Sequence, residues 1–118
     1  MPENDTVILD VEATLERLKG DKAFLHTLFG VFLEDLPQKL IALNNAAREG
    51  NQEDILRTAH SLKGASATIG APALRDAANT IETATRNGDT ATAAVGIASL
   101  DEVAQELLAR LREEIAKG

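Results

Sequence analysis

The chain contains 118 residues, carries a formal net charge of −7 and has no cysteine. The acidic balance argues against nucleic-acid binding, which needs a basic patch, and against a helix lying on an anionic membrane, which needs clustered Lys and Arg. The lack of cysteine excludes a disulfide framework, a thiolate metal site and a cysteine nucleophile. The polar N-terminus is not a signal peptide, and no apolar run approaches the roughly 20 residues that span a bilayer, so we expect a cytoplasmic protein.

The amino-acid composition favours helices over strands. Hydrophobic residues make up 44% of the chain and aromatic residues only 3%, so the core has to be built from Leu, Ile, Val and Ala. Strands prefer β-branched and aromatic side chains, whereas Ala and Leu favour closely packed helices. The length suits one domain over residues 1–118, and no repeat or linker-like stretch divides it.

The first two expected elements are a short helix and a long one. The short helix covers about residues 11–19, and Gly20 suits the left-handed position that ends a helix. Asp21 can cap the long helix, at about residues 22–49. Pro37 lies in its middle, where it removes a backbone hydrogen bond. The apolar spacing continues across this proline, which favours a kinked helix over two separate ones.

Three further helices follow at about residues 52–69, 72–86 and 90–116. Gly70 ends the first of them, and Pro72 fits the first turn of the second. Short connections place consecutive helices antiparallel. The sequence therefore predicts an all-α, up-down-up-down four-helix bundle over about residues 10–116, with a short extra N-terminal helix.

One segment, RTAHSLKG, stands out because its histidine points away from the apolar side of its helix. At about 100° per residue, the side expected to face the bundle holds Ile55, Thr58, Leu62, Ala65 and Ile69, with Ser66 at its edge. His60 lies almost opposite, on the solvent side. Gly64, one turn further on, bares the backbone beside the ring at a cost of up to about 1 kcal/mol relative to Ala. Lys63 adds a positive charge suited to a phosphoryl group.

Each of these residues also has a plainer interpretation. His60 on its own is an ordinary exposed histidine, Lys63 an ordinary surface charge, and Gly64 a concession to packing. His26, the other histidine, has no Lys-Gly companion and is interpreted as structural or as a surface residue. A di-iron bundle needs repeated Glu-x-x-His pairs, and Arg57 stands where the Glu would be. No Gly-rich phosphate loop supports nucleotide binding.

The run AHSLKGASATIGAPAL resembles the signature of histidine phosphotransfer (HPt) domains, with HSLKG matching the family's His-x-Leu-Lys-Gly core. The stretches FLEDLPQKL and LRDAANTIETA resemble the same family, and the similarity covers about residues 9–111. The resemblance implies an antiparallel four-helix bundle. It also implies that His60 is phosphorylated by a histidine kinase or a phospho-aspartyl receiver domain and passes the group on, with Lys63 and Gly64 in support.

The resemblance implies further roles as well. Many members carry Gln or Glu on the next helix, facing the histidine ring, and Glu82 stands at the matching place. A carboxylate there would accept the Nδ1 proton and leave Nε2 as the nucleophile, although a plain surface acid is the alternative. Asn79 could join this polar cluster. The receiver would supply the aspartate and Mg²⁺, so the chain is expected to need no cofactor or metal of its own and to be a phosphocarrier, not an enzyme.

Receiver docking is expected around the imidazole, at Leu56, Arg57, Ala67 and Thr68. An apolar rim is expected from the second helix, at Phe24, Leu28 and Val31. Two alternatives remain open at this point. One is a bundle that binds receiver or kinase domains without being phosphorylated, and the other is a phosphotransfer module excised from a larger hybrid or chemotaxis-type kinase.

Overall fold

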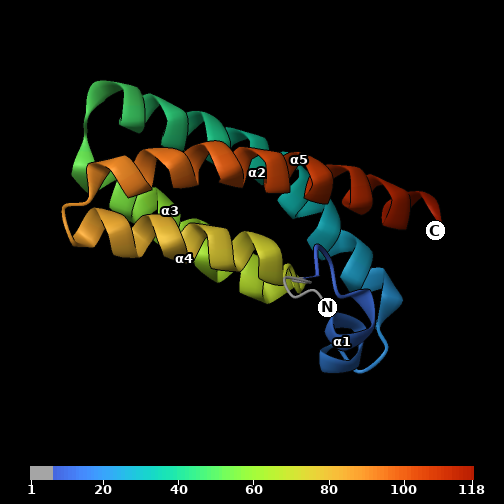
Figure 1. Ribbon diagram of the computed structural model, residues 1–118. Coiled ribbons are helices and arrows are strands. Elements are labelled where there is room, and N and C mark those ends of the chain that lie inside the picture. The colour runs from blue at the N-terminus through green and yellow to red at the C-terminus, as the bar shows by residue number, and fades with distance from the viewer. Residues whose placement is uncertain (1–6) are drawn as a thin grey trace.

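The computed structural model describes residues 7–118, which form helices and no strand (Figure 1). The helices are α1 (Val11–Arg17), α2 (Lys22–Glu49), α3 (Gln52–Ile69), α4 (Pro72–Arg86) and α5 (Thr90–Ala116). The predicted all-α fold is confirmed, and the bounds of the four longer helices are those expected. Within residues 7–118, no helix combines the length and the apolar character that crossing a membrane requires.

Local capping explains these bounds. Asp21 accepts a hydrogen bond from the backbone N–H of Phe24 at the start of α2, and Asn51 and Asp89 do the same for α3 and α5. These contacts satisfy amide groups that have no partner inside the helix. Gly50 and Gly70 end α2 and α3 in the left-handed conformation, which glycine adopts without steric cost.

The end of α1 differs from the prediction. The helix stops at Arg17, whereas the sequence predicted it to continue to about residue 19. Lys19 itself turns left-handed, with φ 58°, together with Gly20 at φ 81°. The amide of Gly20 then donates to the carbonyl of Leu15 over 2.9 Å, which closes the helix earlier with a Schellman-type bond.

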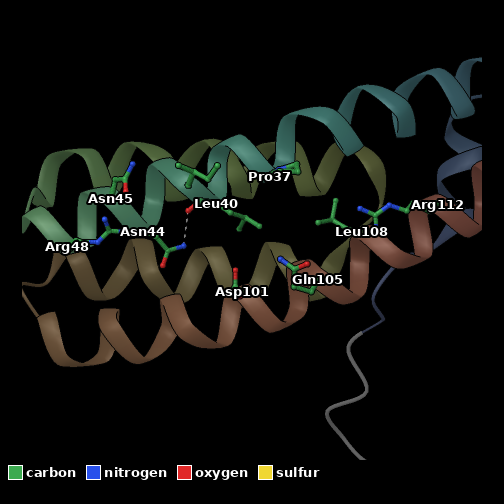
Figure 2. Close-up of a pocket in the computed structure, with 10 residues that line it drawn as sticks. Pro37, Leu40, Asn44, Asn45, Arg48, Asp101, Gln105, Leu108 and Arg112 are labelled. Carbon is green, nitrogen blue, oxygen red and sulfur yellow. Dashed lines mark hydrogen bonds between the residues drawn. The ribbon is translucent and has the colours of Figure 1, made fainter.

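The long helix α2 runs without interruption through Pro37. Proline lacks an N–H, so one bond of the helical ladder is missing at this point. Figure 2 shows the axis of α2 changing direction near Pro37. The expectation of one bent helix rather than two is therefore correct.

The four long helices form a ring in which α2 packs against α3, α3 against α4, α4 against α5 and α5 against α2. In Figure 1, α2 and α5 form one layer of the bundle and α3 and α4 the other. The apolar side chains of the interior are aliphatic apart from the two buried phenylalanines of α2. The largest fully buried apolar side chains are Phe29, Leu36, Leu43, Leu62, Leu74, Ile81, Leu100, Leu107 and Leu111.

The short helix α1 is fastened to the end of α3. The buried hydroxyl of Thr14 is shared between the carbonyls of Asp10, at 2.8 Å, and Ile69, at 3.2 Å, and the amide of Asp10 donates to the carbonyl of Gly70 over 2.7 Å. Arg17 donates from Nη2 to the carbonyl of Thr68 over 3.3 Å. Because the last carbonyls of a helix lack internal partners, α1 acts as a cap for the C-terminal end of α3.

Candidate functional site

His60 projects into solvent from the middle of α3, and its side chain is 70% exposed. The side chains of α3 that face the interior of the bundle differ in part from those predicted. The side chains of α3 that are buried are Ile55, Ala59, Leu62, Ser66 and Ile69. Thr58 and Ala65, predicted to face the bundle, are only half-buried. Ala59 was missing from the predicted set, and Ser66, expected at its edge, is fully buried. The buried side of α3 is therefore turned slightly from the one that the apolar pattern predicted.

Glu82 of α4 lies beside the His60 ring and is almost completely buried, with 3% of its side chain exposed. Its Oε2 is 3.0 Å from His60 Nδ1. An ionised carboxylate only accepts hydrogen bonds, so the ring carries its proton on Nδ1. In the neutral ring, Nε2 is thereby left with a free lone pair, which is the arrangement that a nucleophilic imidazole needs.

Two cations hold this buried carboxylate from its other sides. Lys63 Nζ lies 2.7 Å from Glu82 Oε1, and Arg86 Nη2 lies 3.2 Å from Glu82 Oε2. The bond from the Lys63 ammonium is the main reason why the pKa of Glu82 falls to about 2; the contact with His60 lowers it further, while burial opposes both. Glu82 is therefore charged at neutral pH, as a buried carboxylate with compensating partners can be.

We call His60, Lys63, Asn79, Glu82 and Arg86 the His60 cluster. Lys63 also donates to Asn79 Oδ1 over 3.4 Å, so this amide lies at the edge of the cluster as the sequence suggested. Arg86 was missed. The signal available for it was the spacing of Glu82 and Arg86, since acidic and basic residues four apart on a helix are neighbours.

Gly64 leaves open space beside the ring. A Cβ built on Gly64 would meet no atom within 4 Å apart from its own neighbours in the helix. No packing contact in the described part of the chain therefore requires a glycine at this position. In steric terms, the absent side chain matters to a molecule that approaches α3 from outside.

The four residues predicted for docking lie on α3 around His60. Leu56 is half-buried, whereas Arg57, Ala67 and Thr68 are exposed. Arg57 pairs with Asp54 one turn earlier, so its charge is partly engaged within its own helix. The face is thus small, weakly charged and accessible.

An apolar hollow of about 250 Å³ adjoins this face between α2 and α3. Leu28 and Val31 contribute to it from α2, and Ala65 and Thr68 from α3. Val31 is 61% exposed, and Phe24 near the start of α2 is 48% exposed. Leu28 and Val31 of the apolar rim expected from the sequence therefore line this hollow, whereas Phe24 is exposed but is not part of its wall. Their part in docking stays a prediction.

The sequence of residues 27–116, which is more than half of the chain, matches the family model described as the Hpt domain. The chain belongs to the Hpt domain family. Hpt domains are histidine phosphotransfer modules of phosphorelay systems and are phosphocarriers rather than enzymes of the usual kind. No curated protein matches the chain.

Two solved structures share the fold of this Hpt domain. Histidine-containing phosphotransfer protein B from Pseudomonas aeruginosa PAO1 has a TM-score of 0.87 and 22% identity, over 94% of this chain and 96% of that one. The HPT domain of a sensor hybrid histidine kinase from Shewanella has a TM-score of 0.85 and 19% identity, over the same shares of the two chains. At these identities the likeness concerns the fold.

A second hollow of the Hpt domain lies apart from the His60 cluster. This space lies between α2 and α5 and has a volume of about 470 Å³. In Figure 2, Leu40 and Leu108 lie in its wall and Arg48 and Arg112 at its edges. The His60 cluster comes only from α3 and α4. Asn44 in this hollow already donates to the carbonyl of Leu40 over 2.8 Å, so its amide is engaged within α2.

Side-chain clusters that could bind a metal ion are absent from the described part of the chain. Among residues 7–118, no three His, Asp or Glu side chains gather closely enough to hold a metal ion. The one acidic group of the His60 cluster, Glu82, is already paired with two cations.

Proposed function

We propose that this Hpt domain accepts a phosphoryl group on Nε2 of His60 and exchanges it with the aspartate of response-regulator receiver domains. The observation that carries the proposal is the bond between His60 Nδ1 and the ionised, buried Glu82 over 3.0 Å, on a ring that is 70% exposed. A nucleophile needs both a free lone pair and access to its substrate.

The transfer step follows from this geometry. When Nε2 attacks the phosphorus of a receiver's aspartyl phosphate, the Nε2–P bond forms, the P–O bond breaks and the receiver's aspartate leaves as a carboxylate. The ring keeps its Nδ1 proton and gains a positive charge, which the carboxylate of Glu82 offsets, as the aspartate of a catalytic triad does for its histidine. The reverse step returns the group to a receiver.

Lys63 and Gly64 assist from the same helix. The phosphoryl group carries nearly two negative charges, and the Lys63 ammonium, one turn from His60, can pair with its oxygens. The open space at Gly64 lets the receiver's active site come close to the ring. Mg²⁺ would be held by the receiver, where it would neutralise charge on the transferring group.

The receiver would contact Leu56, Arg57, Ala67 and Thr68, with the hollow between α2 and α3 beside them. The phosphoryl group would enter from a sensor or hybrid histidine kinase, directly or through a receiver. We place this exchange in the cytoplasm, where kinases have access to ATP. Neither a nucleic acid nor a membrane takes part in it.

The test is phosphotransfer profiling against a panel of receiver domains charged with radiolabelled acetyl phosphate. Wild type should take up an acid-labile, alkali-stable label, and His60→Gln should take up none while keeping its helical content by circular dichroism. His26→Gln is the matched control, because it removes the other histidine, and should label like wild type.

Two results would overturn the proposal. A label that persists in His60→Gln would place the phosphoryl group elsewhere. A wild-type protein that binds receivers but takes label from none of them would instead be an interaction bundle without phosphotransfer.

A further inference from the structure

Arg86 pairs with the same carboxylate as Lys63, but on the opposite oxygen. Lys63 contacts Glu82 Oε1 over 2.7 Å, whereas Arg86 contacts Oε2 over 3.2 Å. Oε2 is also the atom that accepts from His60 Nδ1. The buried carboxylate thus has two cations, although one would be enough to balance its charge.

The second cation becomes necessary once His60 is phosphorylated. The Lys63 ammonium then lies near a group with nearly two negative charges, and charge-assisted bonds to phosphoryl oxygens are among the strongest that it can make. If Lys63 turns to the phosphoryl group, Glu82 loses the partner at Oε1. A carboxylate with only 3% of its side chain exposed is poorly solvated. The positive charge of the phosphorylated ring is shared with the phosphoryl group, so Arg86 would then be the one cation of the His60 cluster that is not engaged with that group.

We propose that Arg86 is a positioning residue that keeps Glu82 ionised and bonded to Nδ1 while Lys63 serves the phosphoryl group. This inference rests on the proposed function for the phosphorylated state, but not for the network itself. Arg86 is suited to the role because its guanidinium is always charged. It also reaches Glu82 from four residues further along the same helix, so it can stay in place when Lys63 moves.

The chain offers matched variants for the test. Arg86→Gln removes the charge, and Arg86→Lys keeps it. Arg75→Gln is the control, because Arg75 is another partly exposed arginine of α4 that pairs with an acid, Asp76, outside the His60 cluster. Lys63→Gln and the double variant Lys63→Gln/Arg86→Gln imitate the departure of Lys63 without any phosphorylation.

The first measurement uses the unphosphorylated full chain and the ring ¹⁵N shifts of His60 at fixed neutral pH, which report the ratio of the Nδ1–H to the Nε2–H form. Arg86→Gln alone should change this ratio less than about 2-fold, because Lys63 still holds Glu82. In the Lys63→Gln background the same substitution should lower it about 3- to 10-fold, which lies within the range of coupling energies measured between residues of one salt-bridge network.

The second measurement uses protein phosphorylated with phosphoramidate, whose P–N bond breaks as a P–Nε2 bond forms and ammonia leaves. The fraction of phosphorylated rings that carry an Nδ1 proton should now fall about 3- to 10-fold in Arg86→Gln alone. Arg86→Lys should restore it, and Arg75→Gln should leave it unchanged.

The inference would be overturned if, in the unphosphorylated protein, the Lys63 and Arg86 substitutions changed the ratio of the Nδ1–H to the Nε2–H form additively. It would also be overturned if the fraction of phosphorylated His60 rings that carry an Nδ1 proton were the same in Arg86→Gln as in Arg75→Gln. Neither measurement involves a receiver domain. A failure of the proposed function would therefore appear separately, as a chemically phosphorylated His60 that no receiver accepts.

Discussion

Replacement of Gly64 by alanine should make the protein more stable and a poorer phosphocarrier at once. The added methyl group meets no atom within 4 Å in the folded chain, so nothing opposes the higher helix propensity of alanine. The gain at a helix interior is about 0.5–1 kcal/mol. With an unfolding entropy of about 2.1 cal/mol/K per residue, this corresponds to a rise in Tm of roughly 2–4 °C.

The same methyl group would occupy the space through which, in the proposed function, a receiver reaches His60. Forcing a methyl group into a close-packed contact typically costs about 1–3 kcal/mol, which corresponds to roughly 5- to 150-fold in the rate of transfer. Thermal melts and single-turnover transfer from a charged receiver measure the two effects separately. Gly30→Ala is the control, because Gly30 is also helical with nothing near its Cβ position but lies on α2; it should stabilise the protein without slowing transfer.

A Gly64→Ala protein that transfers at the wild-type rate would show that Gly64 does not provide access for the partner. A lower Tm would be equally damaging, because it would mean that the backbone or surroundings of Gly64 do not tolerate a side chain. The combination of a higher Tm with slower transfer is specific to a glycine retained for a visiting protein.

Three further predictions concern Glu82 and the attachment of α1. The pKa of Glu82 is lowered from 4.5 to about 2 in the folded protein, so its ionised form stabilises the fold above about pH 4.5 and this contribution is lost as the pH falls towards 2. The unfolding free energy of Glu82→Gln, measured with urea, should therefore depend less on pH over that range than that of wild type, and an equal dependence would contradict this. Glu82→Gln keeps an acceptor for Nδ1 but not the charge, so transfer to His60 should slow about 10-fold or more in single-turnover assays, and a wild-type rate would show that the charge is not used. Gly70→Ala should lower the unfolding free energy by at least about 2 kcal/mol, because its Cβ would collide with the Thr14 hydroxyl and the backbone there is left-handed. Gly50→Ala, where the backbone is also left-handed but the surroundings are open, should cost clearly less, and equal losses would mean that the contact with α1 contributes nothing at Gly70.

Where the sequence predictions held, the signals were local. The caps Asp21, Asn51 and Asp89 bond within their own first turns, so residue type and position suffice to find the helix starts. The end of α1 was missed because Lys19 carries no local signal for its left-handed conformation. That conformation accompanies the packing of α1 against the end of α3, which joins residues far apart in the sequence.

Within the site, exposure of His60 could be predicted from helical phase, but the neighbours on other helices could not. Glu82 was placed opposite the ring through family resemblance, not through spacing. Its burial depends on how closely α3 and α4 pack against each other. A close approach also occurs between α4 and α5, where a Cβ on Gly96 would come within 3.0 Å of Ile81. Helix-to-helix distances of this kind are set by pairs of surfaces, and neither sequence segment alone contains them.

The structure assigns different parts of the bundle to stability and to chemistry. Every residue of the His60 cluster comes from α3 or α4, whereas α2 and α5 complete the core with aliphatic and aromatic side chains. A core requires apolar side chains of suitable total volume, which many sequences provide. The site requires particular atoms held at hydrogen-bond distance, which few provide. It follows that substitutions of the buried residues of α2 and α5 should act mainly on unfolding free energy, while those of Lys63, Glu82 and Arg86 should act on the His60 ring first.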